Sequence, residues 1–218
     1  MLGVLLSLAL ASSAPATPPD GSYTYQTSAQ GSTGSSALVL THAASGLQVV
    51  ETASGSIAGV SATASATMML NADLSPASYV GSYSGAGTNV QTTVTFGANG
   101  ATETMTGLGT AAPQTYALGG AGHFAIVDGA LVSGFAILPA QFAAWGNGSI
   151  QVVIPIYGRA EPIAVALATL PRPSAVPKND VALTVSGSIP FTEWYDPKTL
   201  VMDEVEVPSQ SVTITRIH

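Results

Sequence analysis

Three histidines could act as general bases or metal ligands in this chain: His42, His123 and His218. His42 and His123 lie far apart in the sequence, and neither has a second ligand type two or four positions away, as metal sites on strands and helices do. His218 is the last residue, where chains fray. The pattern favours surface or hydrogen-bonded histidines over a metal or catalytic site.

Asp128 is the acidic residue with the most suggestive surroundings. The segment from Ile126 to Ala130 is similar to the aspartic-protease signature, but it lacks the Thr or Ser that follows the catalytic Asp in those enzymes. An apolar segment with helical spacing begins just after Asp128, and Asp is a preferred residue at helix N-caps. We therefore interpret Asp128 as a helix N-cap rather than as a catalytic acid.

Several further patterns could indicate a site. Acidic residues gather near the C-terminus, at Glu193, Asp196, Asp203, Glu204 and Glu206. They could bind calcium, but no D-x-D-x-[DN]-G loop is present, so a solvated strand face is the favoured interpretation.

The glycine-rich segments 85–87 and 119–122 match no phosphate-binding motif and are predicted to be turns. The chain also has no Cys and no G-x-S-x-G motif. We predict a non-catalytic protein without a metal or a cofactor.

The overall composition excludes further classes. Five Lys and Arg against twelve Asp and Glu give a net charge of −7, which leaves no basic surface for nucleic acid. A hydrophobic content of 46% is too high for a disordered chain. The sequence carries no signal that sets the oligomeric state.

The N-terminal residues resemble an export signal. Leu2 to Ala11 is an apolar run, followed by Ala14-Pro15-Ala16, which has the small residues that signal peptidases recognise. The run is about half the roughly 20 residues that a membrane-spanning helix needs. We predict a signal peptide at residues 1–16, no integral membrane span in the mature chain, and an exported protein that is periplasmic, bound in the cell envelope or secreted.

The rest of the chain, residues 17–218, is predicted to be a single antiparallel β domain. Short alternating segments recur along it, such as 90–96 and 150–156, and Asn99-Gly100 is a strong hairpin signal. One segment, near 128–146, has a helical period instead, and Gly134 and Pro139 interrupt it. It should form two short helices or one kinked helix, with Pro139 opening the second. We expect a mainly β fold, a curved sheet with a short kinked helical plug. We expect the last three strands at 181–195, 200–207 and 211–217.

The order of these elements resembles a known group of proteins. The opening Tyr23-Thr24-Tyr25 strand, the segment Asp73–Tyr79, the mid-chain helix and the closing Trp194–Leu200 hairpin are similar to exported bacterial domains of unknown function related to the LolA/LolB-type lipoprotein carriers. The resemblance implies a half-barrel, a curved antiparallel sheet around a helical plug, with a concave apolar surface. It supplies no catalytic residues.

Two functions follow as hypotheses. The first is a binding or carrier domain for an apolar ligand, such as a lipid or an acyl chain, in the cell envelope. Its predicted ligand contacts are the apolar residues of the plug, Phe135, Leu138, Phe142 and Trp145. The alternative is a structural or adhesive surface protein whose core is filled, which the low charge and the Ser, Thr, Gly and Ala content would suit.

Overall fold

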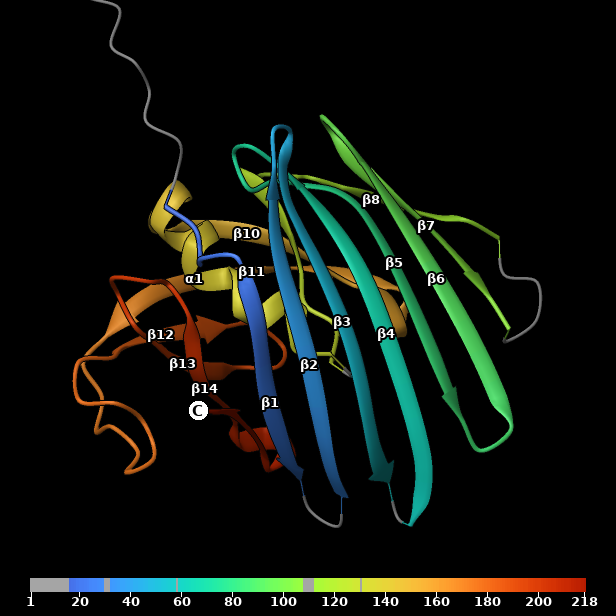
Figure 1. Ribbon diagram of the computed structural model, residues 1–218. Helices are drawn as coiled ribbons and strands as arrows, with labels where there is room; N and C mark the ends of the chain where they lie inside the picture. The colour runs from blue at the N-terminus through green and yellow to red at the C-terminus, as the bar shows by residue number, and fades with distance from the viewer. Residues whose placement is uncertain (1–15, 30–31, 58, 108–111, 130) are drawn as a thin grey trace, which may run out of the picture.

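The computed structural model describes residues 16–29, 32–57, 59–107, 112–129 and 131–218. This part of the chain contains one large sheet of fifteen strands, one α-helix and two short 3-10 helices (Figure 1). The strands are β1 (Gly21–Ala29), β2 (Ser32–Ala43), β3 (Gly46–Ile57), β4 (Val60–Asn71), β5 (Pro76–Gly85), β6 (Thr88–Gly97), β7 (Gly100–Thr106), β8 (Gln114–Ala117), β9 (His123–Ile126), β10 (Gly148–Ile154), β11 (Arg159–Ala168), β12 (Val181–Ser186), β13 (Phe191–Tyr195), β14 (Met202–Val207) and β15 (Val212–Ile217). The helices are α1 (Ser133–Trp145), η1 (Pro155–Tyr157) and η2 (Pro208–Gln210).

The strand order is almost that of a simple meander. Strands β1 to β8 are neighbours in sequence order, β1 also pairs with β15, and the order then runs back from β15 to β9. The pairs are antiparallel except β9 with β10, which are parallel. The predicted mainly β fold, a curved sheet with a helical insert, is confirmed. The predicted long strand 181–195 is wrong, because it folds back on itself as β12 and β13.

The two outer strands of the sheet, β8 and β9, do not pair with each other. Instead β9 packs against β5, and η1 packs against β6. The rings of Phe96 on β6 and Phe124 on β9 meet edge to face, with their centroids 5.6 Å apart. Phe96 belongs to the side of β6 that carries the buried Val94, so β9 lies against the inner face of β6. The curved sheet therefore overlaps itself instead of closing edge to edge.

Helix α1 lies within the curve of the sheet and contacts β3, β9 and β14 (Figure 1). Residues 133–142 are all buried, so this part of the helix is covered on every side. The turn between β4 and β5 supplies part of this cover, and Gln141 donates a hydrogen bond to the carbonyl oxygen of Leu74 there. A Cβ atom at Gly134 would lie 2.2 Å from the carbonyl oxygen of Ile126, so only glycine lets the helix approach β9 this closely. The helix is continuous, and Pro139 lies inside it rather than opening a second helix. The plug thus fills one part of the half-barrel.

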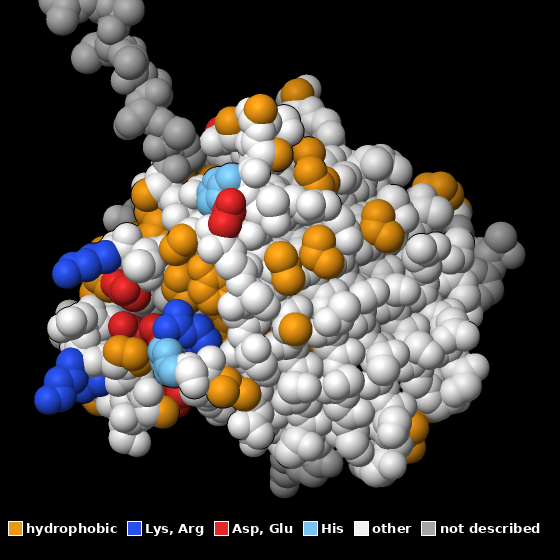
Figure 2. Space-filling view, viewed as in Figure 1, with side chains coloured by type: hydrophobic (Ala, Val, Ile, Leu, Met, Phe, Trp, Pro, Cys, Tyr) orange, Lys and Arg blue, Asp and Glu red, His pale blue; other side chains and the backbone are white. Residues whose placement is uncertain are grey.

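The outer face of β1 to β5 has almost no charge. Figure 2 shows mostly uncharged side chains over these strands, whereas the charged side chains gather on the side of β12 to β14. On β2 and β3 the outward positions include the exposed Ser35 and Thr52, which alternate with inward residues that are apolar or small apart from Glu51. On this face of the molecule, hydroxyl groups rather than ionic groups form the hydrogen bonds with water.

Candidate functional site

A large open cavity of about 670 Å³ lies on the inner face of the long strands. Its wall is mostly apolar and comes mainly from β1 to β6, and Gly129, Ile156 and Val212 complete it. None of the described residues that line it is Lys, Arg, His, Asp or Glu. Pockets of roughly 300–1,000 Å³ are typical of sites for small molecules. This cavity is therefore the strongest candidate for a functional site.

Side-chain size along the strands explains the position of the cavity. At one end of β2 to β5, near α1, the inner face carries large buried residues such as Leu38, Met68 and Tyr79. Toward the other end the inward residues become small, including Gly34, Ala53, Gly55, Ala62 and Ala64. A strand pair that carries Gly and Ala on its inner face cannot fill the space beneath it. The sequence therefore places a packed core beside an open chamber in one sheet.

A hydrogen-bonded cluster lies beside the cavity. The hydroxyl group of Tyr79 donates a hydrogen bond of 2.6 Å to Oδ2 of Asp128, and the hydroxyl of Tyr83 donates to the same oxygen. Asp128 is fully buried, whereas Tyr83 is only half-buried and lines the cavity. Burial, followed by the charge of Asp128, raises the pKa of Tyr79 far above its ordinary value. Tyr79 therefore keeps its proton and stays a donor to Asp128.

Gly81 makes room for this pair of tyrosines. It lies between them on the inner face of β5, and a Cβ atom there would be 2.7 Å from the Tyr79 hydroxyl oxygen and 3.0 Å from that of Tyr83. The residues Tyr79-x-Gly81-x-Tyr83 thus form a unit in which the central glycine lets both rings reach Asp128.

We expect Gly81→Ala to destabilise the protein by about 1 to 2 kcal/mol, because the added methyl group displaces both hydroxyl groups from Asp128. Urea unfolding of the two proteins measures this difference. Gly120→Ala is the matched control, since nothing lies within 4 Å of a Cβ at that position, and it should change stability by less than about 0.5 kcal/mol. Equal stability of the Gly81 variant and the wild type would contradict the role given to Gly81.

Glu51 holds the start of the helix at the boundary between core and cavity. Its two carboxyl oxygens accept hydrogen bonds of 2.8 and 2.7 Å from the backbone N–H groups of Val132 and Ser133. Burial raises the pKa of Glu51, while the bonds from Val132, Ser36 and Ser133 act in the opposite direction. The predicted N-cap role of Asp128 is wrong: the helix begins at Ser133, five residues later, and a glutamate from β3 satisfies its first N–H groups.

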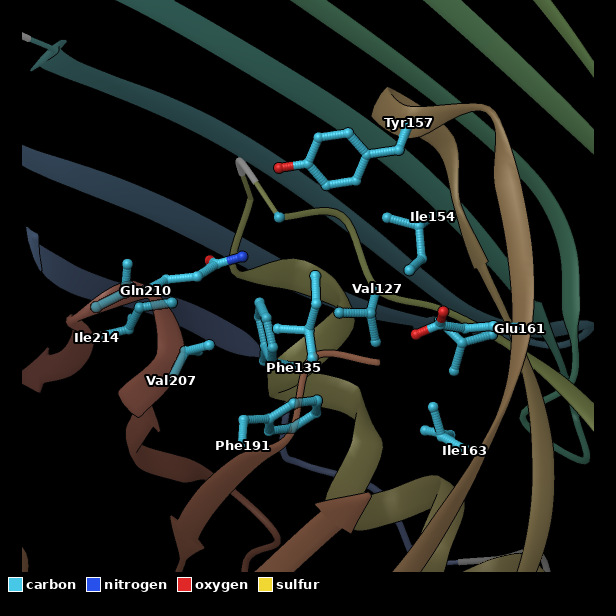
Figure 3. Close-up of a pocket in the computed structure, with 14 residues that line it drawn as sticks. Val127, Phe135, Ile154, Tyr157, Glu161, Ile163, Phe191, Val207, Gln210 and Ile214 are labelled. Carbon is cyan, nitrogen blue, oxygen red and sulfur yellow. The ribbon is translucent and has the colours of Figure 1, made fainter. Parts of the chain in front are cut away.

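A second, smaller cavity of about 50 Å³ lies between α1, strands β10 and β11, and the C-terminal strands (Figure 3). Phe135 and Phe191 form one side, with their rings edge to face at 5.1 Å. The carboxylate of Glu161 faces this space and accepts hydrogen bonds from the hydroxyl group of Ser188 at 2.6 and 2.7 Å. The volume suits a few water molecules rather than a ligand. Gly129 and Val212 line both cavities, so they form part of the division between them.

The four predicted ligand contacts lie in or beside the core. Leu138 is fully buried, and Phe142 is 7% exposed. Phe135 lines the small cavity, and Trp145 stacks on the ring of His123, with 4.3 Å between centroids. The indole N–H of Trp145 also donates to the carbonyl oxygen of Asp73. None of the four lines the large cavity, and contact between them and a ligand stays a prediction.

The other candidate residues do not converge on a common site. His42 contacts Asp20, with 2.5 Å between Nδ1 and Oδ1, near the surface. His218 lies 3.3 Å from Asp203, which also forms an ion pair with Arg216. In the described residues no group of three or more His, Asp or Glu residues could hold a metal ion.

The C-terminal acidic residues differ in their surroundings. Asp196 accepts hydrogen bonds within its own turn, from the backbone of Lys198 and the hydroxyl of Thr199. The predicted solvated face is wrong for Glu193, Asp203 and Glu204, which are buried. Among the described residues, none of these carboxyl groups belongs to a cluster of three or more that could hold a metal ion.

The comparisons with known proteins concern the fold alone. No family model matches the sequence, and no curated protein matches it. One similar solved structure is the crystal structure of a beta-barrel-like protein of the domain of unknown function DUF1849 from Brucella abortus. The two structures agree with a TM-score of 0.61 at 9% sequence identity, over 94% of this chain and 98% of that one. This likeness supports the half-barrel fold, and the narrower relation to LolA/LolB-type carriers stays a prediction.

Across the described residues, no helix has the length and apolar character needed to cross a bilayer. The predicted signal peptide lies outside the described residues except for Ala16.

Proposed function

We propose that this protein is an exported, non-catalytic binding or carrier domain that holds an apolar ligand, such as a lipid or an acyl chain, in its large cavity. The observation that carries the proposal is the cavity itself, about 670 Å³ with a mostly apolar and uncharged wall. Burying the apolar surface of a ligand there gains about 25 cal/mol for each Å² removed from water.

The shape of the sheet supports a ligand that is elongated. The small inward residues continue across five neighbouring strands, from Thr27 on β1 through Gly34, Ala53 and Ala64 to Gly85 on β5. A chain of methylene groups can lie along such a surface, because the inward side chains of β2 to β4 along it are mostly Gly, Ala or Ser, and the large Tyr83 of β5 lies at its border. A compact ligand would use only part of this wall.

The position of the cavity also favours this proposal over the alternative, a structural or adhesive surface protein. A structural or adhesive protein with a filled core would place the plug beneath the whole sheet. Here α1 packs beneath the end with Leu38 and Met68, and the end with Gly34 and Gly55 is left open. The proposed cellular location, in the periplasm, in the envelope or outside the cell, rests on the signal-like residues 1–16.

A direct titration tests the proposal. The purified protein is titrated with an uncharged fluorescent acyl probe, and the fluorescence rise on transfer from water to an apolar site is followed. We expect saturable binding of one probe per chain. The dissociation constant should be about 1 μM, which is equivalent to a binding free energy of about −8 kcal/mol. A response that rises linearly without saturation, at concentrations where the probe is monomeric, would contradict it.

A further inference from the structure

The hydrogen-bonded cluster beside the cavity limits which head group a ligand can carry. No Lys, Arg or His is among the described residues of the cavity wall, so the wall offers no cation to an acidic ligand. Behind the wall lie two carboxyl groups. Asp128 precedes Gly129, and Glu51 lies two residues from Ala53, and both Gly129 and Ala53 line the cavity.

Burial of Asp128 opposes its charged form, whereas the hydrogen bonds that it accepts stabilise that form. Two phenol hydroxyl groups, those of Tyr79 and Tyr83, donate to it, and hydrogen bonds donated to a carboxylate stabilise the anion. Asp128 has no exposed surface, so a ligand in the cavity would experience this charge through Tyr83 and Gly129 rather than contact it. In the low dielectric of a protein interior, such a charge repels a second anion more strongly than it would in water.

The orientation of Tyr83 adds a second requirement. Because its proton is donated to Asp128, the oxygen of this half-buried residue can only accept a hydrogen bond from a molecule in the cavity. Tyr79 lies 3.1 Å away but donates its own proton to Asp128. A ligand at this position therefore needs a donor, such as a hydroxyl group, and should carry no negative charge.

Building on the proposed function, we propose that the cavity selects neutral acyl lipids with a hydroxyl-bearing head group over acyl carboxylates, and that Tyr83 accepts the hydrogen bond from that hydroxyl group. Asp128 is a positioning residue in this arrangement: it orients the Tyr83 hydroxyl group and opposes anionic head groups. Gly81 permits the geometry, because any side chain there would meet both tyrosine hydroxyl groups.

The test compares two ligands with the same acyl chain, 1-monomyristoylglycerol and myristate, by isothermal titration calorimetry at pH 8, where the fatty acid is ionised. The wild type should bind the glycerol ester at least about tenfold more tightly, which corresponds to about 1.4 kcal/mol. Equal binding of both ligands would overturn the proposed selectivity and leave the proposed function intact. Binding of neither ligand would overturn both proposals.

Two variants separate the roles of the two residues. Tyr83→Phe should weaken binding of the glycerol ester about tenfold and leave myristate unchanged, whereas Asp128→Asn should improve binding of myristate. Tyr157→Phe is the matched control, because the exposed Tyr157 does not line the large cavity. Circular dichroism checks that each variant is folded. If Asp128→Asn does not fold, Tyr83→Phe still decides the matter: an unchanged preference in that variant overturns the role of Tyr83.

Discussion

Replacing Glu193 with methionine should stabilise the protein by about 1 to 3 kcal/mol at pH 7, the usual cost of a buried polar group without a partner. Glu193 lies on β13, fully buried between Leu183 of β12 and Val205 of β14. Neither of its carboxyl oxygens has a hydrogen-bond partner among the described residues. Methionine has a similar length and leaves no polar atom unsatisfied. Urea unfolding of both proteins gives the difference.

The same residue should make stability depend on pH. Burial raises the pKa of Glu193 well above its ordinary value of 4.5. At a pH between the ordinary pKa of glutamate and the raised pKa of Glu193, the folded protein binds more protons than the unfolded chain. The free energy of unfolding therefore falls as the pH rises above about 4.5. Glu51 and Asp180, whose pKa values burial also raises, add to this slope in the same direction. The slope between pH 5 and 8 should therefore decrease in Glu193→Met without vanishing.

A neighbouring residue provides the control for this prediction. Glu206 lies on β14, half-buried and opposite Thr192 and Thr213, on the face of the sheet away from Glu193. Glu206→Met should change stability by less than about 0.5 kcal/mol. It should alter the pH slope far less than Glu193→Met does, because the charge of Glu206 makes only a minor contribution to the raised pKa of Glu204. A Glu193 variant less stable than the wild type at pH 7 would indicate that its carboxyl group has a stabilising partner, contrary to the structure.

Filling the cavity should abolish ligand binding without unfolding the protein. Ala53 lies on the inner face of β3, opposite Ser36 and Ala64, so the three small residues leave space for a larger side chain. In Ala53→Phe the ring would occupy the middle of the wall. We expect binding of an uncharged fluorescent acyl probe to weaken at least about tenfold, or about 1.4 kcal/mol. Stability should change by no more than about 1 kcal/mol, because the ring enters open space.

The adjacent residue is the matched control. Thr52 is exposed on the outer face of the same strand and does not line the cavity. Thr52→Phe introduces the same ring on the opposite side of the sheet, and its affinity for the probe should equal that of the wild type. If both variants lost binding equally, the probe would be binding somewhere other than the large cavity.

The fold follows from the sequence where side-chain alternation is strong. The alternating segment 90–96 forms most of β6, and the hairpin expected at Asn99-Gly100 joins β6 to β7, although the turn lies one residue earlier, at Ala98-Asn99. The strand expected over 181–195 is divided because Gly187 and Pro190 lie in a turn that the apolar pattern on both sides obscures. The predicted start of the helix differs from the observed one, because Glu51, a residue distant in sequence, accepts the hydrogen bonds of its first N–H groups.

The cavity could be predicted only in part. The alternation of Ala with Ser or Thr at 62–66 does indicate space beneath one face, but the Gly and Ala residues of neighbouring strands become one wall only through the strand register. The plug has a strong apolar pattern, formed by Phe135, Leu138, Phe142 and Trp145. In a buried helix such a pattern indicates packing in the core rather than contact with a ligand. The pattern Tyr79-x-Gly81-x-Tyr83 was the available signal for the polar cluster, since alternate residues of a strand share a face.

Native mass spectrometry of the protein purified from the cells that produce it, followed by organic extraction, would show whether the cavity holds a natural ligand. We expect a bound species of defined mass that extracts into organic solvent as a neutral lipid with a free hydroxyl group, and that is absent from Ala53→Phe. A mass equal to that of the polypeptide alone, unchanged after incubation with lipids from the same cells, would contradict a carrier of apolar ligands.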